Sequence, residues 1–293
     1  MRLLRPSDAI FAGALAAGAG AATGVVVAQR SSTAAGLVAG VVLAIVVAAL
    51  AARRPLRRLR AVARPLPDGQ RNWLRRHVPL YARSDADGAA RFERDVRIAL
   101  AELRFEGAGG AVATDELRLS VAAGVALLLH GRPDWELPRG RTVLFYDGPF
   151  DDQYDLDDRP EFDGMVHPQG PVILSAPAVR KGWARADGYN VVLHELAHLF
   201  DFQASGADGI PSLLDPASAG AWMQLVREEM RRARTGRSML SGYAATAPAE
   251  LFAVATEQFF ERPARLRRHH AALFDALVAF YQIDPSAVDD DEV

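Results

Sequence analysis

The sequence predicts a mainly helical α+β protein with a small sheet, preceded by a two-helix transmembrane hairpin. Three observations predict it: two long uncharged apolar runs stand near the N-terminus, helical periodicity dominates residues 71–281, and two short β-branched segments interrupt that periodicity. The chain has 293 residues, of which half are hydrophobic and about a quarter charged. It can therefore bury a sizeable core, and it is not a disordered or collagen-like chain.

The net charge of −2 conceals two differently charged parts. Residues 1–64 carry nine Arg and one acid, a net charge of +8, whereas residues 65–293 carry −10. We therefore expect a membrane anchor over 1–64 and a separate globular domain over 65–293. The small overall charge argues against a nucleic-acid partner held by bulk charge. Because the chain has no Cys, disulfides and thiolate metal sites are excluded, and any metal must be held by His and carboxylates.

The anchor is predicted from two uncharged runs, residues 9–28 and 34–52. Each is about as long as a helix that crosses a hydrocarbon core of roughly 30 Å. Both runs contain a pair of glycines four residues apart, which lets two helices approach closely. These pairs are Gly20 with Gly24 and Gly36 with Gly40. A buried soluble hairpin, or a signal peptide in place of the first span, is the alternative.

Arginines predict the orientation of the anchor. Six Arg follow the second run within residues 53–64, and only Arg30 lies between the two runs. The positive-inside rule then keeps the chain after residue 52 in the cytoplasm. We expect a multi-pass hairpin in the inner (cytoplasmic) membrane, with the lipid bilayer as a partner and the globular domain in the cytoplasm.

The elements of the globular domain follow from periodicity and turn residues. A linker at 65–69 precedes predicted helices at 71–81 and 89–105 and a Gly-rich turn at 106–111. Thr114, followed by Asp115 and Glu116, predicts the N-cap of a helix that ends near His130. Strands are expected at 141–146 and 171–175, and helices at 189–202, 218–235, 247–260 and 264–281. The acidic segment 150–163 and the tail 289–292 are expected to be solvated.

An HExxH motif, His194 to His198, is the strongest chemical signal. Residues four apart share one helical face, so both imidazoles can bind one metal ion. Glu195 is offset from them and can take a proton from water at the metal. The surrounding residues are apolar, which predicts a buried helix whose polar groups need partners. Core histidines bonded to the backbone are the alternative.

A hydrolytic zinc site needs a third protein ligand. Glu250 is the better candidate because it begins an otherwise apolar helix, where a lone carboxylate is costly. Glu257 lies on the same face seven residues later and can orient a ligand, or can itself be the third ligand. His269 and His270 stand in an Arg-rich segment typical of a surface turn.

Two further residues are candidates for the site. Asp201 follows His198 by three residues and can contact a ligand or cap the helix end. Tyr243 precedes Glu250 by seven residues, and its phenol can donate a hydrogen bond to an oxyanion. A packed core aromatic is the other interpretation of Tyr243.

These motifs resemble the MtfA-type (Mlc titration factor A) family of zinc metallopeptidases. The similarity is carried by residues 187–201, which surround the HExxH motif, by residues 243–254, and by 257–260. Weaker matches occur at 105–108, 114–116 and 280–285, so the resemblance covers roughly residues 70–285. Its conservative departures are Leu196 and the pair Leu199 and Phe200, and the segment between Asp201 and Tyr243 is shorter.

The resemblance implies a zincin-like catalytic domain that holds one zinc ion through His194, His198 and Glu250. It also implies Glu195 as the general base and, by similarity to the catalytic domain of anthrax lethal factor, Tyr243 as the transition-state hydrogen-bond donor. Aminopeptidase activity and a transcriptional-repressor partner, the glucose repressor Mlc, follow from the resemblance alone. The best-known member is soluble, whereas this chain adds an apolar hairpin.

The sequence thus predicts a membrane-anchored, zinc-dependent peptidase that acts on a peptide or protein substrate. Residues 171–175 are expected to form an edge strand that pairs with the extended substrate. A membrane-tethered sequestering or regulatory protein with a non-catalytic zinc site is the alternative. An intramembrane protease is excluded, because only 13 residues separate Asp187 from Asp201 around the motif.

Overall fold

A computed structural model confirms the mainly helical α+β class with a small sheet. It describes residues 1, 6–137, 142–150, 162–166, 170–201, 209–211 and 213–286. Most of the acidic segment 150–163 and the whole tail 289–292 lie outside the described residues. The chain divides into two compact units, Arg2–Pro65 and Leu66–Val293.

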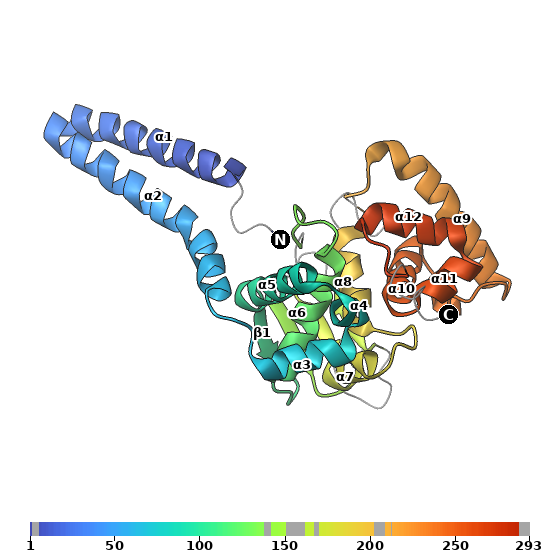
Figure 1. Cartoon of the computed structure of the whole chain (residues 1–293). Coiled ribbons are helices and arrows are strands. Elements are labelled where there is room, and N and C mark those ends of the chain that lie inside the picture. Colours follow the sequence, from blue (N-terminus) through green and yellow to red (C-terminus); the bar gives the residue numbers. More distant parts are fainter. Residues whose placement is uncertain are drawn as a thin grey trace. The chain divides into compact units, whose positions relative to one another are not determined.

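The first unit contains two helices that are long and apolar enough to cross a membrane, α1 (Pro6–Arg30) and α2 (Thr33–Val62). They lie side by side (Figure 1) and meet at the predicted glycines. A Cβ atom at Gly20 would lie 2.7 Å from the carbonyl oxygen of Gly40, so larger side chains would push the helices apart. The expectation that the second helix ends near residue 52 is wrong, because α2 continues through the arginine segment to Val62.

Short helices open the second unit. The segment expected as one helix at 71–81 is two, α3 (Asp68–His77) and α4 (Pro79–Arg83), because proline disfavours helical geometry in the preceding Val78. Helix α5 (Ala86–Glu102) ends earlier than predicted. The residues after it form strand β1 (Arg104–Gly107), where the sequence predicted the end of the helix and the start of a turn.

The sheet has four strands in the order β1, β2, β4, β3. Strands β2 (Thr142–Tyr146) and β4 (Val172–Ser175) confirm the two predicted strands, and β1, β2 and β4 run parallel. Strand β3 (Gly164–Val166) pairs antiparallel with β4 and was not predicted. The expectation that 171–175 is an edge strand is therefore wrong: β4 is interior, and β3 forms that edge of the described sheet.

Helix α6 (Asp115–Leu129) connects β1 to β2, and the Thr114 side chain caps it as predicted by accepting from the Leu117 amide. The helix is buried on nearly every side and packs against α8 (Val191–Asp201). Gly124 permits this approach, since a Cβ there would lie 2.7 Å from Val192 Cγ1. The metal-motif helix is thus held inside the core.

Two of the remaining helices, α7 (Ala176–Ala184) and α10 (Pro248–Glu261), contact α8 directly. Helix α7, which was not predicted, leads into α8 from β4, and α10 packs along it. Helix α9 (Ala219–Arg234) and α10 match the predicted helices to within a residue or two. The helix expected at 264–281 is two, α11 (Pro263–His269) and α12 (Ala271–Tyr281), separated by His270, whose backbone is not helical (φ −141°, ψ 54°).

Candidate metal centre

Asn190 fixes the beginning of the motif helix. Its side-chain oxygen accepts a hydrogen bond from the Leu193 amide (3.3 Å), and its carbonyl oxygen accepts from the His194 amide (3.0 Å). This is the arrangement of an N-cap residue, which satisfies amides that lack partners in the first turn. All residues of α8 except His194 are buried, so the helix has little freedom to rotate.

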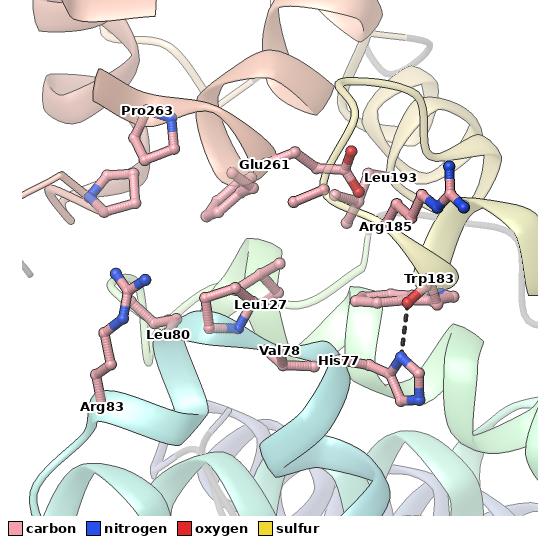
Figure 2. A pocket seen from close by; sticks show the side chains of 15 residues that line it. His77, Val78, Leu80, Arg83, Leu127, Trp183, Arg185, Leu193, Glu261 and Pro263 are labelled. Carbon is pink, nitrogen blue, oxygen red and sulfur yellow. Dashed lines mark hydrogen bonds between the residues drawn. The ribbon is translucent and has the colours of Figure 1, made fainter. Parts of the chain in front are cut away.

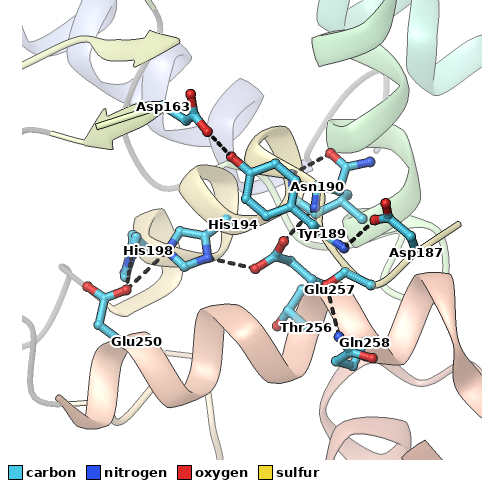
Figure 3. Close-up of polar contacts among 12 residues, drawn as sticks. Asp163, Asp187, Tyr189, Asn190, His194, His198, Glu250, Thr256, Glu257 and Gln258 are labelled. Carbon is cyan, nitrogen blue, oxygen red and sulfur yellow. Dashed lines mark hydrogen bonds and ion pairs between the residues drawn. The ribbon is translucent and has the colours of Figure 1, made fainter. Parts of the chain in front are cut away.

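His194, His198 and Glu250 converge from two helices (Figure 3). Oε2 of Glu250, in the first turn of α10, lies 3.0 Å from Nε2 of His194 and 3.5 Å from Nε2 of His198. One atom from each side chain lies within 4.8 Å of the others. Two imidazole nitrogens and one carboxylate oxygen are suitable donors for a divalent transition metal, so the three residues can hold one ion.

Glu257 contacts a member of this group from the opposite side. Its Oε1 lies 2.8 Å from Nδ1 of His194, and its Oε2 accepts from the Asn190 amide at 2.5 Å. Glu250 and Glu257 therefore bracket the His194 ring, one at each nitrogen. A carboxylate in the Glu257 position fixes the tautomer and orientation of the imidazole, and the geometry favours Glu250 over Glu257 as the third ligand.

Glu195 lies beside the group and against strand β3. Only 6% of the residue is exposed, and a Cβ atom added at Gly164 would lie 2.6 Å from its Oε1. Burial raises the pKa of the Glu195 carboxyl, the two motif histidines oppose that shift, and the charges of Glu250 and Glu257 add to it. A carboxyl group with a raised pKa is a stronger base than an ordinary carboxylate and is better suited to accept a proton from water.

Two of the converging side chains, Glu250 and His194, have strongly shifted pKa values. Burial opposes ionisation of Glu250, but hydrogen bonds with His194 and His198 outweigh it and lower the pKa of the carboxyl well below its ordinary value. Burial likewise opposes protonation of His194, whereas Glu250 and Glu257 raise its pKa to about 10. Strongly perturbed groups of this kind cluster at functional sites.

Tyr243 stands at the edge of the group, in the short 3-10 helix Gly242–Ala245. Its ring centroid is 6.0 Å from that of His194, and half of the residue is exposed. It is therefore not a packed core aromatic. Burial of the phenol and the charges of Glu250 and Glu195 raise its pKa to about 12, so it carries its proton at neutral pH and can donate it in a hydrogen bond.

The other candidates lie outside this group. Asp201 is the last residue of α8 and is fully buried. The surface-turn interpretation is wrong for His270, which is 1% exposed and contacts Glu229 at 2.6 Å while its other ring nitrogen accepts from the Met239 amide. It holds the chain that leads toward Tyr243. His269 is exposed, as expected.

Sequence reasoning missed the polar groups that support the site. Tyr189 donates to Asp163 at 2.5 Å, which ties the start of β3 to the start of α8. Glu261 accepts from the Gly188 amide (2.8 Å) and from the Asn190 side-chain amide (3.1 Å). The one usable signal was Asn190 itself, because an Asn directly before an apolar helix is a typical N-cap.

Comparisons with known proteins identify relatives of this chain. An uncharacterized protein of Synechocystis sp. is 28% identical over 247 residues, which cover 76% of this chain and 86% of that protein. The Mlc titration factor A proteins of Salmonella arizonae and Salmonella typhimurium are each 33% identical over 159 residues, or 49% of this chain. The match spans 63% and 60% of the two Salmonella proteins, less than two thirds of their length.

The family model of the glucose-regulated metallo-peptidases M90 matches residues 52–282, which include the whole HExxH segment, Tyr243, Glu250 and Glu257. The match extends over most of the chain and includes every residue of the converging group. This chain therefore belongs to the glucose-regulated metallo-peptidase M90 family.

Proposed function

We propose that this chain is a membrane-anchored, zinc-dependent peptidase in which His194, His198 and Glu250 bind the metal and Glu195 is the general base. The observation that carries the proposal is the convergence of two imidazoles and one carboxylate beside a buried glutamate. Zinc fits this donor set, because hydrolytic zinc sites use three His or carboxylate ligands and leave one position open. When bound, zinc would polarise the scissile carbonyl group and stabilise the negative charge that develops on it.

The protein's own groups would then move the protons. Glu195 takes a proton from the attacking water and delivers it to the leaving amine nitrogen. Tyr243, whose raised pKa keeps it protonated, donates a hydrogen bond to the carbonyl oxygen as charge develops. Glu257 holds His194 in one orientation throughout. Removal of Glu195 therefore abolishes proton transfer without removing a metal ligand.

We place the substrate along the outer edge of strand β3. The strand runs beside Glu195, and no other described strand pairs with its outer edge. An extended peptide that adds to this edge would bring its backbone next to the general base, as in β-augmentation. This role replaces the one that the sequence assigned to residues 171–175.

A cytoplasmic orientation completes the proposal. Helices α1 and α2 are the two spans, and the arginines between residues 53 and 64 hold the following domain on the cytoplasmic side of the inner membrane. A reporter enzyme fused after Val293 should be active only when the fusion point is cytoplasmic. Activity of a reporter that requires export would contradict this orientation.

The name of the Salmonella relatives, Mlc titration factor A, supports a second candidate. In this candidate the chain sequesters a transcriptional repressor, and its zinc site has no catalytic role. The test compares the wild-type chain with Glu195→Gln on a peptide library, with mass spectrometry to locate the cleaved bonds. A peptidase loses about 10²–10⁴-fold in turnover and keeps its metal, whereas a sequestering protein shows no turnover in either form. The cleavage sites also distinguish an aminopeptidase from an endopeptidase.

A further inference from the structure

A cavity lies in the domain, and none of the three proposed metal ligands lines it. Its volume is about 150 Å³, and it is bounded by the α3–α4 corner, the end of α7 and the junction of α10 with α11 (Figure 2). The walls are largely apolar and include Val78, Leu80, Trp183, Phe260 and Pro263. An apolar cavity of about 150 Å³ is large enough for a molecule the size of benzene.

One acidic side chain, Glu261, stands in this apolar wall. Its two oxygens accept hydrogen bonds from the Gly188 amide and the Asn190 side chain, both of which are neutral donors. Among the residues that the structure describes, no Arg, Lys or His forms an ion pair with it. Burial, together with the charges of Glu257 and Asp187, raises the pKa of Glu261 to about 8. A partly buried carboxylate without a cation is costly, so this wall is complementary to a positive charge.

The cavity lining also contains the basic residues Arg83, Arg185 and His77. Arg83 and Arg185 are both exposed residues, so we assign their guanidinium groups to the mouth of the cavity. His77 contacts the backbone oxygen of Trp183 through Nδ1 at 2.7 Å. The interior therefore favours an ammonium group with an apolar body, and the mouth tolerates an anionic group.

We propose that this cavity is a binding site for a small molecule in which a primary ammonium group is joined to a short apolar chain. The ammonium group pairs with Glu261, and the apolar chain packs against Trp183 and Leu80. Two sources share this chemistry: a simple aliphatic amine and a free apolar amino acid, whose carboxylate would reach the arginines at the mouth. None of the three proposed metal ligands lines this cavity.

The test is isothermal titration calorimetry on the full chain in detergent at pH 7, with 3-methylbutylamine and L-leucine as probes. At least one should bind, and tighter binding of leucine identifies the amino acid as the better ligand. Because Glu261 is mostly protonated at pH 7 and must ionise to pair with an ammonium group, binding should release about one proton. This release appears as a dependence of the binding enthalpy on the ionisation enthalpy of the buffer. The analogue 4-methylpentanoate lacks the ammonium group and should not bind.

Two variants and one control make the result decisive. Glu261→Gln should weaken binding at least 10-fold and abolish proton release, and Leu80→Trp should block binding by filling the cavity while leaving Glu261 in place. Glu228→Gln, at an exposed glutamate of α9 outside the cavity lining, should bind like the wild type. Failure of both probes to bind at millimolar concentration, or binding unchanged by Glu261→Gln, would overturn the proposal.

Discussion

At the scale of single residues, the site combines groups that the sequence marks with groups that it does not. The HExxH spacing places His194 and His198 on one face of α8, and a carboxylate in the apolar start of α10 marks Glu250. These predictions need only helical periodicity and the cost of burying charge. The links from Glu257 to Asn190 and from Asn190 to Glu261 depend on how α8 and α10 pack, which no local pattern encodes.

Replacement of Glu257 by Gln tests the role of the residue behind His194. The variant loses the negative charge beside Nδ1 of His194. Its amide group can also place an N–H donor where the carboxylate offered only acceptor oxygens, so metal affinity should fall about 10–100-fold. Competition with a metal-binding dye measures the change. Asp275→Asn, at an exposed acid of α12, is the matched control and should bind metal normally. Unchanged affinity in Glu257→Gln would remove this residue from the account.

At the scale of elements, the long helices were predictable and the short pieces were not. Helix α6 begins at its predicted cap, and α9 and α10 lie within a residue or two of their predicted bounds, because each has a sustained apolar face. Strand β3 has only three residues, too few to show an alternating pattern, and it is stabilised by antiparallel pairing with β4, which follows it closely along the chain. Strand β3, beside Glu195, therefore takes the place of residues 171–175 as the edge of the described sheet.

Gly164→Ala tests whether the backbone of β3 and Glu195 must lie in contact. The added methyl group would lie 2.6 Å from Glu195 Oε1 and 2.7 Å from its Cγ, so Glu195, the proposed general base, must move. We expect kcat to fall about 10-fold or more, since small displacements of a catalytic group are costly, while metal content stays normal. Gly220→Ala is the control, because a Cβ there meets nothing within 4 Å. Wild-type kcat in Gly164→Ala would show that this contact does not position Glu195.

The glycine contacts between α1 and α2 give a second test at this scale. In Gly40→Leu the added side chain collides with the backbone of Gly20, so the two helices should separate. In Gly18→Leu the added side chain points into open space, so the distance between the helices should not change. Because the chain has no Cys, two cysteines introduced at the exposed positions Phe11 and Leu50 can carry spin labels. The expected result is a longer or broader distance distribution in Gly40→Leu alone. Identical distributions in both variants would argue against glycine-mediated packing.

At the scale of the whole molecule, the charge division of the sequence matches a chain of two different compact units. The family match begins at residue 52, so it leaves out nearly all of the apolar hairpin and includes the globular unit. Hydropathy was sufficient to predict helices α1 and α2, because an uncharged apolar run of about 20 residues usually forms a helix. It did not predict where α2 ends, since the arginines that follow it are also good helix formers.

Glu261 predicts how the stability of the folded domain depends on pH. Its pKa is raised from 4.5 to about 8 in the folded chain, so between these values the folded state binds more protons than the unfolded state. The contribution of Glu261 to stability therefore decreases as pH rises from 4.5 to 8 and levels off above pH 8. We expect the Tm difference between Glu261→Gln and the wild type, measured by circular dichroism, to shift in favour of the variant by several degrees between pH 5 and pH 8. Each kcal/mol of stability changes Tm by about 2–4 °C in a domain of this size. A difference that does not vary with pH would mean that Glu261 ionises normally.

The central claim is that one metal ion, held by His194, His198 and Glu250, makes this chain a peptidase. The most direct measurement is peptide hydrolysis by the full chain before metal removal, after chelation, and after titration with zinc. We predict that chelation abolishes cleavage and that one equivalent of zinc restores it in the wild type but not in Glu195→Gln. Cleavage that survives complete metal removal, or a chain that binds zinc yet cleaves no peptide, would contradict the account.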